Sequence, residues 1–312
     1  MARQRKPTNL HLTLQRFAAP IVEDPQLHCG SWRDLMPGAR EVRLDLGCGK
    51  GSFLKESALL EPDVLFVGMD YSPTCIARCA EKAVQSDLPN VRLIMADADQ
   101  VTDLFAPGEL DRIYLNFNAP FPKKKHARLR LSHVERLMEY RTLLSSTGLL
   151  ELRTDNVLYW RFSLEQLRIA NYRTLRQTTD LAALTTWDRD RAPVLTSEYF
   201  ARTTQRGAHV YALLAQPGPA PDHWEQTAPL GLCEYLPQDL DQLDHIPYGM
   251  ESTVQNMRNR QANQRRRQQT QSRAGRPSQP GLPGQRSQSA KPAQPNSPES
   301  TTSPAQKESP HE

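Results

Sequence analysis

The chain has 312 residues and a net charge of +4, and it contains no run of about 18 apolar residues of the kind that spans a membrane. The charge is unevenly distributed, because residues 255–312 hold ten Lys/Arg against three Asp/Glu and leave residues 1–254 with a net charge of −3. The five cysteines are odd in number and scattered, and the N-terminus has no apolar signal segment, so we expect a protein of the reducing cytoplasm without disulfides.

Short apolar runs of strand type alternate with segments of helical length along the centre of the chain. The predicted strands are 42–47, 64–70, 91–97, 111–117, 148–155 and 210–216, and the predicted helices include 52–60, 73–86 and 132–144. Near-continuous apolar strands separated by helices indicate an α/β fold, a doubly wound and mostly parallel sheet with helices on both faces. Ser72, followed by Pro73, is predicted to cap one helix, and Ser132 with Glu135 is predicted to form a capping box on another.

Composition divides the chain into four expected segments. An N-terminal extension (1–37) precedes the α/β domain (38–217), and a peripheral appendage (218–254) follows it. Residues 255–312 are rich in Gln, Ser, Pro and Arg and lack the apolar surface that offsets the entropy of ordering, so this basic tail is predicted to be disordered.

The stretch LDLGCGKGSF, Leu44–Phe53, joins the first predicted strand to the first helix. Gly47 and Gly49 permit a tight turn and a close approach of a ligand to the backbone. Asp70 and Asp97 end the next two strands, at the edge of the sheet where ligands bind in such folds, and are placed to bond a ribose and an adenine amino group.

Asp45 opens this glycine pattern, which reads G-x-G-x-G, and its carboxylate disfavours a pyrophosphate but suits a ligand with an ammonium group. Together these segments resemble class I S-adenosylmethionine-dependent methyltransferases. An α/β domain whose glycines serve only packing is the alternative.

The stretch NFNAPFPKKKHARLR, Asn116–Arg130, follows the fourth predicted strand. Pro120 and Pro122 fix their own φ angles, so the loop loses little entropy when it binds a partner. Its basic residues are Lys123, Lys124, Lys125, His126, Arg128 and Arg130. Their position at the ligand edge favours a clamp for a nucleic-acid backbone over an ordinary solvated charge run.

Four segments in this order resemble the tRNA (guanine-N7-)-methyltransferase family, over about Arg43 to Gln216. They are LDLGCGKGSFL, DRIYLNFNAPFPKKKHARLRLSH, LRTDN and TSEYFARTTQRGAHVY. The resemblance implies the Rossmann-like methyltransferase fold, S-adenosylmethionine as cofactor, and methylation of a guanosine in the variable region of tRNA. It implies cofactor contacts at Asp45, Asp70 and Asp97, to which we add Gly47, Gly49 and Asn118. It implies substrate contacts at Lys123 and Asp155 and in the segment of Ser197, Glu198, Tyr199 and Phe200.

Four positions depart from the family pattern, and two of them remove an acidic residue. The family loop usually reads N-F-P-D-P-W-P-K-K, but here Asn118, Ala119 and Phe121 stand at its proline, aspartate and tryptophan positions, and Phe200 replaces the last acid of T-E-Y-E. Guanine N7 is an acceptor with a free lone pair, so methyl transfer to it needs no general base. We predict that Asn118 and Glu198 act as the catalytic residues and take over part of the role of the missing aspartate.

Several alternatives remain open at this stage. The chain is either an active enzyme, a weak or inactive tRNA-binding paralogue, or a methyltransferase retargeted to another substrate. Asp155 is a substrate contact or only a strand-end cap, Arg153 is a candidate phosphate contact, and His126 and His133 are expected at the surface. The run Arg258–Arg273 is either a cationic arm for RNA or an inert tail. We expect tRNA as partner, no membrane, no metal, and a monomer or homodimer.

Overall fold

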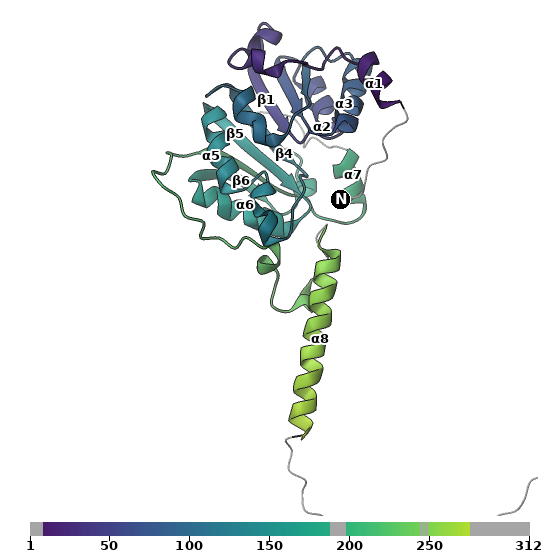
Figure 1. Ribbon diagram of the computed structural model, residues 1–312, viewed down its shortest axis with the longest axis vertical. Coiled ribbons are helices and arrows are strands. Elements are labelled where there is room, and N and C mark those ends of the chain that lie inside the picture. Colours follow the sequence, from purple (N-terminus) through teal and green to yellow (C-terminus); the bar gives the residue numbers. More distant parts are fainter. Residues whose placement is uncertain (1–8, 188–197, 244–245, 247–248, 275–312) are drawn as a thin grey trace, which may run out of the picture. The chain divides into compact units, whose positions relative to one another are not determined.

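The computed structural model describes residues 9–187, 198–243, 246 and 249–274 (Figure 1). The chain divides into two compact units, Met1–Asn263 and Gln264–Glu312, and the sheet lies in the first. Because residues 188–197 and 275–312 are not described, the expectations for Ser197 and for most of the predicted tail lie outside the described residues.

Seven strands form one sheet in the order β3-β2-β1-β4-β5-β7-β6. They are β1 Glu41–Leu46, β2 Val64–Met69, β3 Val91–Ile94, β4 Leu110–Asn116, β5 Leu144–Thr154, β6 Tyr172–Thr178 and β7 Tyr211–Pro217. The first five strands of this order pair in parallel, and β7 runs antiparallel to both β5 and β6. The predicted doubly wound fold, the Rossmann-like methyltransferase arrangement, is confirmed. The strand order reverses between β1 and β4, which is where ligands bind in open sheets of this kind.

The helices are α1 Leu10–Arg16, α2 Ser52–Leu60, α3 Pro73–Gln85, α4 Val101–Leu104, α5 Val134–Leu143, α6 Val157–Ile169, α7 Glu198–Gln205 and α8 Glu251–Ala274. The helices cover the two faces of the sheet. Successive residues of β2 point to opposite faces and belong to different core clusters. Val64 and Phe66 pack in one cluster with α2 and α3, whereas Leu65 and Val67 pack in another with α5 and α6. This two-residue period is the geometry of a strand, and it explains why the strands read as continuous apolar runs.

Edge strand β6, Tyr172–Thr178, was not predicted. Its sequence YRTLRQT has only one buried residue, Tyr172, so no apolar run marks it. It forms because antiparallel pairing with β7 satisfies its backbone groups. At the opposite edge of the sheet, the segment before β1 covers β3 through the bonds Leu93 N to Pro20 O and Val22 N to Leu93 O, which are 2.8 and 2.9 Å long.

The two predicted helix caps have different outcomes. Ser72 caps α3 as predicted, since its Oγ accepts a hydrogen bond of 3.4 Å from Cys75 N. The prediction for Ser132 was wrong: the cap of α5 is His133, whose Nδ1 accepts from Glu135 N. Ser132 is instead buried, with its Oγ 2.7 Å from Ser163 Oγ of α6. His133 was expected at the surface but is buried, because it packs against the ring of Phe162.

Residues 255–274 were predicted to be disordered, but they form most of helix α8. It runs from Glu251 to Ala274, through the first twenty residues of the segment expected to be disordered. Its sequence contains no Gly or Pro and is dominated by Gln and Arg, which favour helix. Met250 and Val254 are fully buried in the main core, so the first turn is anchored and the cost of helix nucleation is offset there. Disorder was predicted from the lack of apolar residues alone, and neither the helix propensity of the sequence nor the burial of the first turn was taken into account.

Candidate functional site

The site lies where the strand order reverses, at the carboxyl ends of β1 and β4. The loop after β1 turns through Gly47 and Gly51, whose φ angles of +79° and +72° favour glycine. Space also demands glycine here, because a Cβ on Gly47 would lie 2.6 Å from Asn118 Nδ2 and one on Gly51 would lie 2.1 Å from Cys79 Sγ. The glycine loop therefore packs directly on the loop after β4 and on α3.

Two asparagines flank the buried carboxylate of Asp45. Asn116 Nδ2 donates to Asp45 Oδ1 at 3.1 Å, and Asn118 Nδ2 donates to Leu46 O at 3.0 Å. The Oδ1 atoms of both asparagines are buried and have no hydrogen-bond partner among the residues that the structure describes. Buried acceptors of this kind are rarely left unsatisfied in a working protein, so two unpaired acceptors beside one carboxylate indicate a ligand that donates hydrogen bonds.

Asp45 is 1% exposed. Burial raises its pKa to about 7, although the hydrogen bond from Asn116 and the nearby charge of Arg153 act in the opposite direction. A carboxylate that is costly to ionise in the free protein gains most from a cationic ligand. Asp45 is therefore suited to an ammonium group, as the sequence predicts.

Asp70 connects the glycine loop to the start of α3 through two hydrogen bonds. Its Oδ2 accepts a hydrogen bond of 3.0 Å from Gly49 N, and its Oδ1 accepts one of 2.8 Å from Ser72 N. Burial raises its pKa, and these two N–H donors lower it again in part. Asp97 is exposed and caps the short helical turn Ala98–Gln100. Asp70 directly follows β2, as predicted, whereas β3 ends at Ile94, three residues before Asp97. The cofactor contacts assigned to both carboxylates remain predictions.

The basic loop divides into an exposed half and a buried anchor. Lys123, Lys124, Lys125 and Arg128 are exposed, as expected for residues that contact a polyanion. Arg130 was predicted to belong to the same positive field, but it is fully buried. Its guanidinium donates to the carbonyls of Pro120, Phe121 and Leu230, with shortest distances of 3.0, 2.7 and 2.8 Å. Burial lowers its pKa to about 10.

Helix α7 brings Glu198 and Tyr199 to the same edge. Tyr199 donates from its hydroxyl to Asp155 Oδ2 at 2.9 Å, and its ring lies 4.8 Å from that of Phe117. Glu198 pairs with Lys82 of α3 at 2.9 Å, and the hydrogen bond from that lysine holds the pKa of Glu198 below its usual range. Tyr199 is thus hydrogen-bonded to Asp155, and Glu198 forms an ion pair with Lys82. The catalytic roles of Glu198 and Asn118 stay predictions.

The sequence comparisons agree with this geometry. A family model described as "Putative methyltransferase" matches residues 39–213. A tRNA (guanine-N(7)-)-methyltransferase of Geobacillus thermodenitrificans is 41% identical over 147 residues, which cover 47% of this chain and 68% of the relative. The same-named protein of Brevibacillus brevis is 31% identical over 195 residues, which cover 62% of this chain and 89% of the relative. The chain belongs to the tRNA (guanine-N7-)-methyltransferase family.

Solved structures add only a loose likeness. The crystal structure of the 16S rRNA methyltransferase KamB matches with a TM-score of 0.48 at 16% identity, and covers 61% of this chain and 94% of that chain. The strand order of the sheet itself therefore defines the fold of this tRNA (guanine-N7-)-methyltransferase family member.

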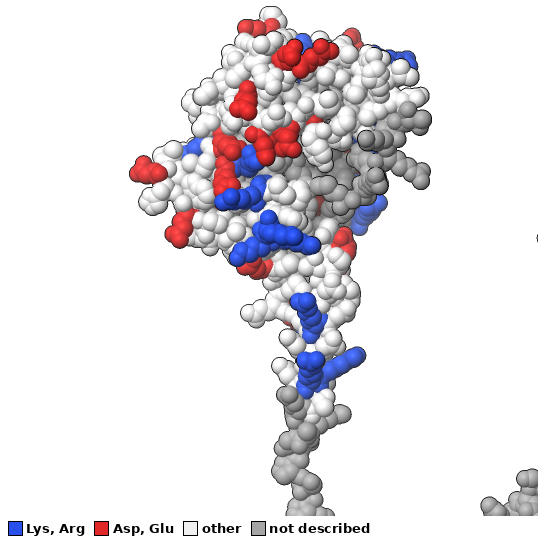
Figure 2. Space-filling view, in the orientation of Figure 1, with Lys and Arg blue, Asp and Glu red and all other residues white. Residues whose placement is uncertain are grey.

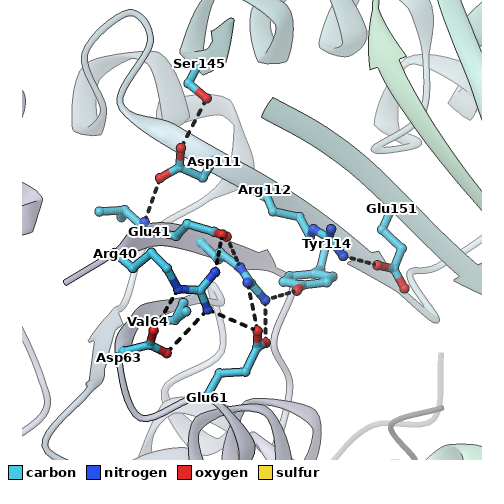
Figure 3. Close-up of polar contacts among 12 residues, drawn as sticks. Arg40, Glu41, Glu61, Asp63, Val64, Asp111, Arg112, Tyr114, Ser145 and Glu151 are labelled. Atoms are coloured by element: carbon cyan, nitrogen blue, oxygen red, sulfur yellow. Dashed lines mark hydrogen bonds and ion pairs between the residues drawn. The ribbon is translucent and has the colours of Figure 1, made fainter. Parts of the chain in front are cut away.

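Ion pairs of charged side chains on β1, β4 and β5 extend across the sheet (Figure 3). Arg43 of β1 pairs with Glu41 and with Glu61, whose Oε2 lies 2.6 Å from its Nη1, and Arg112 of β4 pairs with Glu151. Arg153, which was a candidate phosphate contact, is buried and bonds Glu151 at 2.6 Å. That expectation was wrong, because a buried side chain that is held by Glu151 cannot reach an RNA backbone.

The sequence analysis did not identify Asn116 and Lys82 as residues of the site, and it assigned Arg130 the wrong role. Asn116 bonds Asp45, Lys82 bonds Glu198, and Arg130 holds the basic loop. Asn116 had a detectable signal, since it ends the predicted strand beside the glycine loop. Lys82 had none, because it lies on another helix, 116 residues from its partner. In the described part of the chain no cluster of His, Cys, Asp or Glu is placed to hold a metal ion, and no helix is long and apolar enough to cross a bilayer.

Proposed function

We propose that this chain transfers a methyl group from S-adenosylmethionine to N7 of a guanosine in the variable region of tRNA. The observation that carries this proposal is the pair of unpaired amide oxygens on Asn116 and Asn118 beside the buried carboxylate of Asp45. The similarity to relatives named tRNA (guanine-N(7)-)-methyltransferase supports it.

The residues of the site fit S-adenosylmethionine, which, when bound, supplies an electrophilic methyl group on a sulfonium. Asp45 and the amide oxygen of Asn116 accept the hydrogen bonds of an ammonium group, and Asn118 adjoins them through its bond to Leu46 O. Asp70 holds the glycine loop open through its backbone bonds and presents a carboxylate to ribose hydroxyls. Asp97 takes the adenine amino group. The site holds no phosphate-binding feature of the G-x-G-x-x-G type.

Methyl transfer to N7 requires alignment of the two reacting atoms and does not require removal of a proton. The guanine nitrogen already carries a lone pair, so the task of the chain is to hold it in line with the methyl carbon at about 3 to 3.5 Å. Asn118 is placed for this role, because its Nδ2 is bound to Leu46 O while its Oδ1 remains an acceptor for the N–H groups of guanine. Glu198 adds negative charge that favours the cationic product, and its bond to Lys82 fixes where that charge lies.

The exposed lysines of the loop and the α7 contacts complete the substrate side. Lys123 begins the basic turn Lys124–Leu129 and contacts a phosphate next to the target base. Asp155, Ser197 and Tyr199 position the nucleotide, with the Tyr199 hydroxyl fixed by Asp155. This substrate places the activity in the cytoplasm, where we expect the protein as a monomer or homodimer.

The test is a methyl-transfer assay with labelled S-adenosylmethionine and unmodified tRNA, followed by identification of the methylated nucleoside. We expect N7-methylguanosine. Loss of one neutral hydrogen bond in Asn118→Ala is expected to lower kcat by about 3- to 10-fold. In Ala119→Asp, which restores the acid typical of the family, we expect kcat/KM to rise by about tenfold or more, the scale of a charged hydrogen bond. Thr174→Ala, at an exposed position of edge strand β6, serves as the control.

A weak or inactive tRNA-binding protein is the second candidate, favoured by one observation, the alanine at position 119. Under that reading the chain binds tRNA and forms no N7-methylguanosine, and Ala119→Asp does not restore the reaction. A methylated product on a different nucleoside identifies a retargeted enzyme instead.

A further inference from the structure

Helix α8 lies beyond the segment that matches the family, which ends at residue 213. Residues 252–274 contain six arginines and no acidic residue. The chain that follows is different, because residues 275–312 hold four Lys/Arg against three Asp/Glu. The positive charge of the C-terminal segment is therefore concentrated in one ordered helix.

The start of α8 is fixed to the folded unit along one face. Val254 is fully buried, Arg258 donates from Nη2 to Leu240 O at 2.9 Å, and Gln261 donates from Nε2 to Gln238 O at 2.8 Å. These three positions are spaced by four and three residues, which places them on the same side of a helix. Arg258 is thus a structural residue, and its charge is used to hold the helix in place.

A second face of the same helix carries exposed arginines. Arg260 and Arg267 are seven residues apart, so they share one face, and at about 100° per residue that face points away from Val254 and Gln261. Arg266 is their neighbour, and all three side chains are exposed. Among the described residues, no acidic side chain forms an ion pair with any of the three. Figure 2 shows basic side chains, in blue, along the described part of this helix. Exposed arginines without an acidic partner add little to stability, whereas their charge and planar donors suit the phosphates of a polyanion.

We infer that the face of α8 formed by Arg260, Arg266 and Arg267 is a second RNA-binding surface, which contacts the phosphate backbone of the tRNA substrate. This inference rests on the proposed function, because tRNA is the polyanion it names. Backbone contacts made by a helix add affinity without reading the sequence. The surface therefore strengthens capture of tRNA and leaves the choice of guanosine to the site at β1 and β4.

The test measures binding of an unmodified tRNA transcript without S-adenosylmethionine, by fluorescence anisotropy over a series of salt concentrations. For Arg260→Gln/Arg266→Gln/Arg267→Gln we expect the slope of log K against log salt to become shallower by about 2 to 3, close to one for each phosphate that the helix no longer neutralises. The matching triple Arg→Lys variant keeps the charge, so its slope is expected to stay near that of the parent chain.

Two controls separate the helix from other sources of charge. Deletion of residues 275–312 removes a net charge of only +1 and is expected to leave the slope unchanged. Replacing Arg33, Arg78 and Arg168 by Gln removes three exposed arginines that are each paired with an acid, and is expected to have the smaller effect. Circular dichroism of the Gln triple variant confirms that α8 remains helical.

The outcomes distinguish this inference from the proposed function. An unchanged salt slope in the Gln triple variant, with methylation intact, overturns the RNA-binding surface and leaves the enzyme standing. A shallower slope in a chain that forms no N7-methylguanosine supports the surface and overturns the enzymatic proposal. Loss of binding to phosphatidylglycerol vesicles without any change in tRNA binding would assign α8 to a membrane surface and also overturn the inference.

Discussion

Single side chains at the end of β1 set the chemistry of the site. Asp45 is buried between Asn116 and the glycine loop, and burial raises its pKa to about 7. Because the unfolded chain loses this proton at a much lower pH, the contribution of Asp45 to the free energy of unfolding falls as pH rises from about 4 to about 7. Ligand binding has the opposite dependence, since an ammonium group binds the ionised carboxylate.

We therefore predict that affinity for S-adenosylmethionine rises by about tenfold between about pH 6 and about pH 8, as the ionised fraction of Asp45 grows. Isothermal titration calorimetry at several pH values measures this. Asp45→Asn is expected to bind weakly with little dependence on pH, whereas Asp97→Asn keeps the dependence of the parent chain. A flat profile for the parent chain would contradict the role of Asp45.

At the scale of elements, the basic loop depends on a segment far along the chain. Arg130 donates to Pro120 and Phe121 within the loop and to Leu230 beyond β7, and Leu232 N donates to Pro122 O at 3.0 Å. The 218–254 segment was expected to be peripheral, yet its residues 230–232 support the substrate loop. Because Arg130 ends a run of basic residues, the sequence alone predicts that its side chain is exposed.

Arg130→Lys is expected to disturb the loop, because one ammonium cannot reach all three carbonyls, and each unpaired carbonyl costs about 1–3 kcal/mol. We expect a lower melting temperature and a strongly reduced kcat on tRNA, with affinity for S-adenosylmethionine retained. Arg128→Lys, on an exposed arginine paired with Glu135, should behave as the parent chain does. Full methylation by folded Arg130→Lys would show that the loop does not need this anchor.

At the scale of the whole molecule, the N-terminal segment is part of the core. Trp32 is fully buried, stacks on Phe105 with ring centroids 5.2 Å apart, and donates from its indole nitrogen to Leu104 O. Glu109 accepts hydrogen bonds from the backbone of Gly30 and Trp32. The boundary expected between residues 37 and 38 therefore does not separate this segment from the sheet.

Trp32→Ala is expected to lower the free energy of unfolding by about 3–5 kcal/mol, the cost of a large cavity in a core. Urea unfolding followed by circular dichroism measures it. Leu27→Ala provides the control, because Leu27 is 77% exposed and its loss should change stability by less than about 0.5 kcal/mol. A change in Trp32→Ala as small as that of the control would mean that the segment is dispensable to the core.

The sequence by itself determined six of the seven strands, the glycine loop and the family. Apolar periodicity, Gly47 to Gly51 and the acids Asp45 and Asp70 are local features, and each follows from the residues within one strand and its turn. The tertiary structure alone decided which charges are buried. Arg130 depends on Leu230, 100 residues away in the chain, and Glu198 depends on Lys82, 116 residues away. The partner of a polar side chain is set by packing between elements, and a linear pattern does not contain that information.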